Sequence, residues 1–243
     1  MDLFKTWIVE RNIAHRGLHN EKMPENTIPA FENAIKNSYP IELDVQQIAD
    51  GTLVVFHDKT LKRLTERDGY VKKLNKESLQ EYKILGSEFS IPTFEEVLEL
   101  VNGQVPLLIE IKNTGKVGEL EKALWNVLKN YKGEFAVQSF NPFSLEWFKK
   151  NAPNVIRGQI ASYLSDQKNM SWFKKYFLRK MSFNKKISEP HFIAYDWHNL
   201  PNHYVNKFKD LPLLAWTVKS QEEYLATLPH CDNIIFEGFE PKL

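Results

Sequence analysis

Short apolar runs recur along the chain, and turn residues or helix-period segments separate them. Runs of about four to eight residues rich in β-branched and aromatic side chains are typical of strands. Nine runs are predicted as strands: 12–15, 41–46, 53–57, 107–111, 135–139, 155–160, 192–196, 213–218 and 233–236. Helical patterns lie between most of them, for example at 94–101, 118–130 and 143–150. This alternation predicts an α/β protein.

Acidic and apolar positions alternate along residues 41–46, and a period of two is a strand signal. Successive side chains of a strand point to opposite faces, so Glu42 and Asp44 share one face. On an interior face these anions stay ionised together only if a cation compensates them, and hard oxygen ligands suit Mg²⁺ or Ca²⁺. A half-exposed strand with both acids facing water fits the same alternation, so both interpretations stay open.

An Ala-Asp-Gly turn signal follows this strand, and the next run is β-branched and aromatic, so the two runs are predicted as a hairpin. In an antiparallel hairpin with this turn, Asp44 lies opposite Phe56. Glu42 then lies opposite Asp58, and His57 becomes a neighbour of both acids. Two acids and a histidine on one strand pair are plausible metal-site chemistry, although a single histidine at a strand end is more often structural.

His15 and Arg16 end the first apolar run, before a loop and a helix predicted from Thr27 to about Asn37. They therefore lie at the carboxyl end of a first strand, which is where active sites are found in parallel α/β proteins. Arg16 carries a permanently charged fork that matches phosphate oxygens.

Glu110 and Lys112 lie two residues apart at the end of the apolar run 105–112, so they share a strand face. A simple ion pair explains this spacing. The functional interpretation makes Glu110 a further metal ligand and Lys112 a cation that neutralises phosphate.

The ordered motifs of the chain resemble those of the glycerophosphodiester phosphodiesterase family, and the resemblance spans about residues 12 to 240. The specific motifs come first: His15-Arg16-Gly17, Pro24-Glu25-Asn26-Thr27, Glu42-Leu43-Asp44-Val45 and His57-Asp58. Three weaker ones follow: Glu110-Ile111-Lys112, Ser139-Phe140-Asn141 and Trp216-Thr217-Val218.

The resemblance implies a (β/α)₈ TIM barrel and metal-dependent hydrolysis of glycerophosphodiesters to sn-glycerol 3-phosphate and an alcohol. Nine runs exceed eight barrel strands, so run 53–57 is assigned to the hairpin, with a small insertion at about 65–90 after it. A chain of 243 residues fits a single barrel domain over residues 1–243.

Carried over by position, the resemblance assigns roles to single residues. His15 and His57 are the expected acid–base pair, and Arg16 and Lys112 are expected to contact the phosphate. One divalent cation, Mg²⁺ or Ca²⁺, is expected on the carboxylates Glu42, Asp44 and Glu110. Trp216 either forms an apolar wall for the glycerol or fills the barrel, since tryptophan serves both purposes.

Two other functions stay open. One is a lysophospholipase D-like or lyase-type phosphodiesterase that acts on membrane lysophospholipids. The other is a non-catalytic lipid-binding barrel, against which the presence of both histidines and all three acids argues. Attack by water and attack by the glycerol hydroxyl through a cyclic phosphate are both compatible with the residues.

Composition narrows the partners and the location. A net charge of +1 argues against a nucleic-acid binder, and the single Cys231 allows no intramolecular disulfide. Charges within residues 1–11 interrupt a signal-peptide core, and no apolar stretch reaches transmembrane length. We therefore expect a cytoplasmic enzyme.

Residues 171–186 combine aromatic side chains at helical spacing with lysines and an arginine. A basic amphipathic helix of this kind can make peripheral contact with an anionic membrane, which would favour a lysophospholipid substrate. A barrel helix that packs its aromatic side chains inward and solvates its lysines explains the same pattern.

Overall fold

The computed structural model describes residues 2–113, 115–163, 171–181 and 184–242. The chain folds into two compact units. One unit is Ala14–Phe135, and the other combines Met1–Ile13 with Ala136–Leu243.

The 14–135 unit is built on strand β2 (Ile41–Gln47), which is parallel to β1 (Ile13–Ala14) and to β4 (Leu107–Ile111). Its antiparallel neighbour is β3 (Leu53–Val55), with Val45 paired to Val55. The amide of Phe56 donates to the carbonyl of Asp44 over 2.9 Å. The predicted hairpin and its register are therefore confirmed, and this register brings residues 57–58 toward the half of β2 that carries Glu42 and Asp44.

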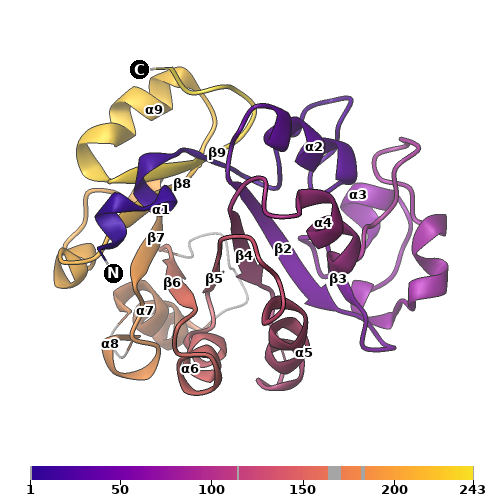
Figure 1. Ribbon diagram of the computed structural model, residues 1–243. Helices are drawn as coiled ribbons and strands as arrows, with labels where there is room; N and C mark the ends of the chain where they lie inside the picture. The colour runs from indigo at the N-terminus through magenta and orange to yellow at the C-terminus, as the bar shows by residue number, and fades with distance from the viewer. Residues whose placement is uncertain (1, 114, 164–170, 182–183, 243) are drawn as a thin grey trace. The chain divides into compact units, whose positions relative to one another are not determined.

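Helices of this unit cover the strands and present apolar faces to them. They are α2 (Ile28–Lys36), α4 (Phe94–Val101) and α5 (Glu119–Leu128). Helix α4 begins at a capping box, in which the Thr93 hydroxyl accepts from the Glu96 amide and the Glu96 carboxylate accepts from the Thr93 amide. Helices α2 and α4 pack side by side (Figure 1).

The segment after the hairpin forms short helices: α3 (Lys62–Thr65) and the 3₁₀ helices η2 (Val71–Lys73) and η3 (Lys76–Glu81). Where the structure describes this segment, it contains isolated bridges but no strand, as expected for the insertion. An apolar cluster joins this segment to the hairpin, and it includes Phe56, Leu61 and Leu64. This cluster fixes the short helices, which have too few internal hydrogen bonds to be stable alone.

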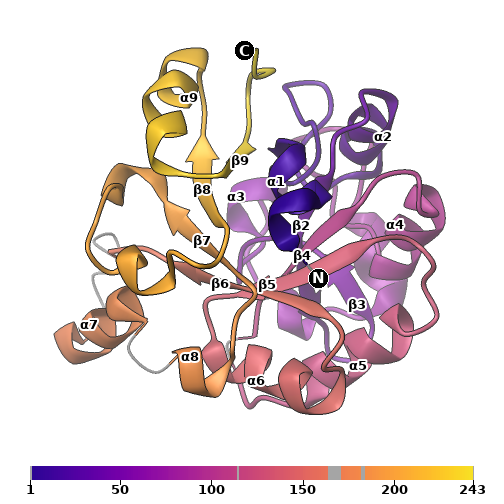
Figure 2. The ribbon, with the colours of Figure 1, turned by 60° about the vertical axis from the view of Figure 1, so that its left-hand side comes forward.

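The 136–243 unit is a series of parallel strands, each paired with the next: β5 (Phe135–Ser139), β6 (Ile156–Ala161), β7 (Phe192–Asp196), β8 (Leu213–Val218) and β9 (Asn233–Phe236). Its helices are η1 (Leu3–Lys5), α1 (Trp7–Glu10), α6 (Pro142–Asn151), α7 (Trp172–Lys180), α8 (Asn184–Ile187), η4 (Trp197–Asn199), η5 (Val205–Phe208), α9 (Gln221–Thr227) and η6 (Leu228–His230). Figure 2 shows α6 beside α8, and α7 at the periphery of this unit. The Asn233 side chain ties α1 to β9 by donating to the carbonyls of Ile8 and Arg11.

No helix among the described residues is long and apolar enough to cross a bilayer.

Candidate active site

Three buried carboxylates meet on one face of the parallel strands β2 and β4. Asp44 and Glu110 are register partners in the parallel pair, and Glu42 lies two residues before Asp44 on the same face. One oxygen from each side chain lies within 4.8 Å of the other two. The alternative in which the β2 acids face water is therefore wrong, because both side chains are interior.

Two cations compensate part of this charge. Lys112 Nζ lies 2.8 Å from Glu110 Oε1 and 3.1 Å from Asp44 Oδ1, and Arg16 Nε lies 3.3 Å from Asp44 Oδ2. Burial alone would raise the pKa of Asp44, but the charges of Lys112 and Arg16 lower it well below its usual range. Burial likewise opposes the charged form of Lys112, but Asp44 and Glu110 raise its pKa. The ion pair between Glu110 and Lys112 that the sequence suggested is present, and Lys112 also pairs with Asp44.

The cluster still carries one more negative than positive charge when all of its groups are ionised. Burial, followed by the charges of Asp44 and Glu110, raises the pKa of Glu42 well above its usual value. A hard divalent cation would relieve this repulsion, because clustered carboxylate oxygens are the ligands that such ions prefer. The three side chains therefore fit a metal ion.

The loop after β1 turns its backbone toward Glu42. Arg16 has a left-handed φ of 54°, and its amide donates to Glu42 Oε2 over 3.1 Å. His15 Nε2 lies 3.8 Å from the same oxygen. Gly17 follows with φ of 83°, and a Cβ at this position would lie 2.9 Å from the backbone of Ala30. Only glycine fits this close approach, which sets the direction of the His-Arg pair.

His57 and Asp58 form a dyad, in which Nδ1 lies 2.6 Å from Oδ1. Although burial opposes ionisation, hydrogen bonds from Arg63 and His57 lower the pKa of Asp58 to about 2. Since an ionised carboxylate can only accept, Nδ1 carries the hydrogen, and Nε2 of His57 is the nitrogen left for chemistry.

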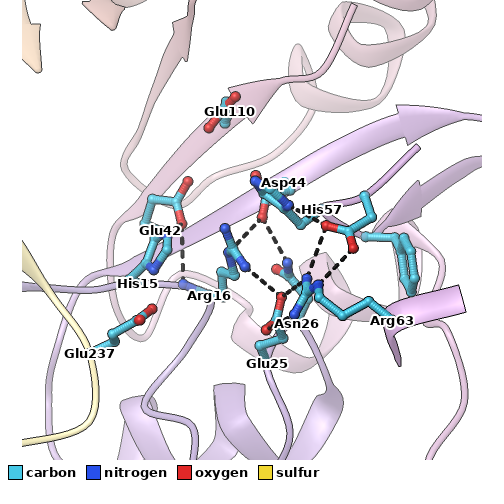
Figure 3. A network of polar contacts seen from close by, with 12 residues as sticks. His15, Arg16, Glu25, Asn26, Glu42, Asp44, His57, Arg63, Glu110 and Glu237 are labelled. Carbon is cyan, nitrogen blue, oxygen red and sulfur yellow. Dashed lines mark hydrogen bonds and ion pairs between the residues drawn. The ribbon is translucent and has the colours of Figure 1, made fainter. Parts of the chain in front are cut away.

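Three further residues belong to this network and had no role assigned from the sequence. Glu25 Oε1 accepts from Arg16 Nη1 over 2.6 Å, and Asn26 Nδ2 donates to Asp44 Oδ2 over 2.8 Å. Figure 3 shows Arg16 between Glu42 on one side and Glu25 and Asn26 on the other. The third residue is Arg63, which bonds both Glu25 and Asp58. The Pro-Glu-Asn-Thr motif marked the first two residues, whereas no motif marked Arg63.

Seven of the eight expected site residues lie in the 14–135 unit, and the eighth, Trp216, lies on β8 of the 136–243 unit. Its ring meets Phe140 edge-on, with centroids 5.7 Å apart. Its indole Nε1 is buried and has no hydrogen-bond partner among the described residues. Trp216 thus presents both an apolar ring and a hydrogen-bond donor.

Helix α7 presents aromatic side chains to solvent. The exposed fractions of Trp172, Phe173 and Tyr176 are 65%, 58% and 39%. The rings of Trp172 and Phe173 stack with centroids 3.9 Å apart. The alternative in which the aromatic face packs inward is therefore wrong for these three side chains.

Other residues of this segment anchor it to its unit. Met181 is buried. Arg179 donates to the carbonyl of Tyr163 and lies over the Tyr163 ring, 4.5 Å from its centroid. Residues 182–183 and the side chains of 174, 177 and 184 lie outside the described part of the expected segment.

Fold and site together define the class: an α/β protein in which a buried acidic cluster on two neighbouring parallel strands could hold a metal ion. The chain belongs to the glycerophosphoryl diester phosphodiesterase family, whose model matches residues 15–234. The expected family membership and (β/α)₈ barrel fold are thereby confirmed.

Individual relatives agree with this assignment. A glycerophosphodiester phosphodiesterase of Caldanaerobacter subterraneus subsp. tengcongensis is 41% identical over 160 residues, which cover 61% of this chain and 65% of the relative. The solved structure of an Oleispira antarctica phosphodiesterase, in complex with the product sn-glycerol-3-phosphate, has a TM-score of 0.75 at 24% identity. The match covers 95% of this chain and 93% of the Oleispira antarctica chain. The Thermotoga maritima glycerophosphodiester phosphodiesterase has a TM-score of 0.70 at 25% identity, with 93% and 94% covered.

Proposed function

We propose that this protein is a metal-dependent phosphodiesterase that hydrolyses glycerophosphodiesters to sn-glycerol 3-phosphate and an alcohol. The observation that carries the proposal is the buried trio Glu42, Asp44 and Glu110, compensated by Lys112 and Arg16. An anionic phosphate suits a site that combines fixed cations with metal ligands. The product bound to the Oleispira antarctica phosphodiesterase supports the same substrate class.

The phosphate would be held by charge. Arg16 and Lys112 supply fixed cations beside the acidic cluster, and they offset the charge that grows on the phosphoryl oxygens in the transition state. A divalent cation on Glu42, Asp44 and Glu110, Mg²⁺ or Ca²⁺, would polarise a phosphate oxygen as a Lewis acid. Glu25 and Asn26 orient Arg16 and Asp44 and do not contact the substrate in this proposal.

His15 and His57 would exchange protons with the substrate. One removes the proton from the attacking oxygen, and the other protonates the leaving alkoxide. The Asp58 carboxylate holds His57 in the tautomer that leaves Nε2 available. His15 is held near Glu42 by the loop after β1. Attack by water and attack by the glycerol hydroxyl use the same pair of histidines.

Product analysis tests the proposal. The purified chain should convert glycerophosphocholine to sn-glycerol 3-phosphate and choline in the presence of Mg²⁺ or Ca²⁺, followed by phosphorus NMR and a choline assay. A cyclic phosphate as the final product would instead indicate a lyase. A folded protein that turns over no diester but binds lipid would leave the non-catalytic lipid-binding barrel.

A second candidate function is peripheral contact with an anionic membrane through α7, which would make a lysophospholipid the substrate. The exposed Trp172, Phe173 and Tyr176 are suited to the bilayer interface, and Lys175 and Lys180 lie on the same helix. Arg179 is engaged by Tyr163 and is not counted among the lipid-binding cations.

Vesicle flotation separates this contact from catalysis. Lys175→Gln with Lys180→Gln should weaken binding to vesicles that contain phosphatidylglycerol, because each Lys near the surface contributes about 1 kcal/mol. Trp172→Ser with Phe173→Ser should also weaken it, because these exposed aromatic side chains are suited to the bilayer interface. Lys207→Gln with Lys209→Gln changes the net charge equally at exposed positions elsewhere and should bind as the parent does. A parent protein that does not bind anionic vesicles at low salt contradicts the membrane role.

The cytoplasmic location and the single-domain organisation over residues 1–243 stay predictions from the sequence.

A further inference from the structure

One exposed arginine of the insertion joins two separate parts of the active site. Arg63 lies in α3, and its guanidinium contacts Glu25 from the loop after β1 and Asp58 from the end of the hairpin. Each of these carboxylates also contacts a residue proposed to act on the substrate, Arg16 and His57 respectively. We propose that Arg63 is a positioning residue that holds the phosphate-binding arginine and the catalytic histidine dyad in one arrangement.

The bonds of Arg63 use its planar fork on both sides. Nη1 and Nη2 donate to the two oxygens of Glu25, each over 2.8 Å. Nε donates to Asp58 Oδ2 over 2.7 Å, and Nη2 also donates to Asp58 Oδ1 over 3.0 Å. Paired hydrogen bonds from a planar guanidinium fix the angle as well as the distance of a carboxylate. Arg63 therefore restricts the rotation of both acids, which a lysine at this position could not do.

The helix that carries Arg63 is itself anchored. Leu61 and Leu64 flank the arginine and are almost completely buried. They pack with Phe56 in the apolar cluster that joins the hairpin to the insertion. Phe56 directly precedes the His57-Asp58 dyad in the sequence. The same small core thus fixes both the guanidinium and the dyad that it binds, so the insertion is part of the active-site framework.

Two chains of contacts start from Arg63. The first runs through Asp58 to Nδ1 of His57, where the carboxylate fixes the tautomer and the ring orientation. The second runs through Glu25 to Arg16, whose Nε lies beside Asp44. Loss of Arg63 should misorient His57, which lowers kcat, and loosen Arg16, which raises KM for an anionic substrate. A purely structural role would lower the fraction of active enzyme and leave KM unchanged.

The kinetic test compares three single variants on glycerophosphocholine. Arg63→Gln should lower kcat roughly 10–100-fold, as expected when a residue that orients a site ligand is removed, and it should raise KM as well. Arg63→Lys keeps the charge but loses the fork, so it should recover only part of both losses. Arg67→Gln is the matched control, because Arg67 belongs to the same insertion and faces Glu81, 3.9 Å away and outside the site. It should behave as the parent does.

A double-mutant cycle assigns the first chain. If Arg63 acts on His57 through Asp58, then Arg63→Gln should lower kcat much less in an Asp58→Asn background than in the parent. In the Glu25→Gln background its effect on KM should shrink in the same way. Fully additive effects in both backgrounds would overturn the proposal.

A second measurement does not depend on turnover. In protein labelled with ¹⁵N-histidine, the Nδ1–H signal of His57 should be present in the parent and in Arg67→Gln, and weakened or shifted in Arg63→Gln. The kinetic part rests on the proposed phosphodiesterase function, but the NMR part does not, so an inactive parent with the expected NMR result would contradict only the function. Parent-like kinetics and an unchanged His57 signal in folded Arg63→Gln would overturn the positioning role. Should Arg63→Gln fail to fold, Arg63→Lys carries the same two measurements.

Discussion

A divalent cation should stabilise this protein, and most strongly at neutral to alkaline pH. The perturbation is removal of metal by EDTA followed by addition of Mg²⁺ or Ca²⁺. Ionised carboxylates no more than 4.8 Å apart repel one another by about 3.5 kcal/mol per pair at an effective dielectric constant of about 20. Lys112 and Arg16 offset much of this repulsion but leave one negative charge uncompensated in the fully ionised cluster.

The size of the effect follows from mass action. A cation present at about 100 times its dissociation constant adds about 2.7 kcal/mol to the free energy of unfolding. For a chain of 243 residues, each kcal/mol corresponds to roughly 2–4 °C in the melting temperature. The expected rise in melting temperature is therefore about 5–11 °C.

The pH dependence follows from the pKa shifts. Burial and the neighbouring carboxylates raise the folded-state pKa of Glu42 above its unfolded value. Its contribution to stability is therefore complete below the unfolded pKa, and it is lost as the pH rises through the raised folded value. Asp44 has the opposite shift, so its contribution is present above its ordinary pKa and is lost only in acid. A bound cation favours ionised Glu42, so the stabilisation by metal should grow as the pH rises.

Calorimetric unfolding between pH 5 and pH 8.5, with EDTA or with saturating Mg²⁺ or Ca²⁺, measures this effect. Glu110→Gln should reduce the cation-dependent shift, whereas Glu99→Gln, at an exposed position of α4, should preserve it. No rise in melting temperature with either cation at any pH would refute the reasoning. An equal rise in Glu110→Gln and in the parent would place the bound cation elsewhere.

Three shorter predictions concern the residues that build and serve the site. His15→Ala and His57→Ala should each lower kcat on glycerophosphocholine by roughly 10²–10⁴-fold while the circular dichroism spectrum is retained, and near-parental turnover by either folded variant would contradict its role. Gly17→Ala should cost about 1–3 kcal/mol in denaturant unfolding, because its φ is positive and its Cβ would press on Ala30; an unchanged midpoint would contradict the close approach. Phe56→Ala should cost about 3–5 kcal/mol, because this fully buried ring lies in the apolar cluster that joins the hairpin to the insertion. A loss below about 1 kcal/mol would show that the cluster collapses around the gap.

Local pattern was sufficient wherever a strand's own residues determine the outcome. Alternation placed Glu42 and Asp44 on one face, and the turn after β2 set a hairpin register that the Val45–Val55 pair confirms. The partner of Asp44 across the parallel pair is Glu110, which the sequence alone could not give. Parallel register depends on how a crossover helix packs, so the strand pattern indicated Glu110 as a further metal ligand without identifying its partner on β2.

Long-range contacts and surface exposure could not be predicted from the sequence, for different reasons. The contact between Arg63 and Glu25 joins residues 38 positions apart, and α3 has only four residues. No periodic pattern in the sequence therefore predicts this contact. On α7 the aromatic spacing fits an inward face and an outward face equally well. The structure exposes Trp172 and Phe173, and Met181 and Arg179 anchor the helix to its unit.

The insertion does more than lengthen a loop. His57 lies at the end of the hairpin, and its ring is oriented by the Asp58 carboxylate. The ring is therefore fixed only if Asp58 itself is fixed. Asp58 is partly exposed, and a single surface carboxylate would rotate freely in water. The Arg63 guanidinium, carried between the buried Leu61 and Leu64, removes that freedom by binding Asp58. Because the same guanidinium also binds Glu25, it couples His57 to the phosphate-binding Arg16. Cutting the insertion short should therefore impair chemistry and phosphate binding together, even though none of the residues proposed to contact the substrate lies within its helices.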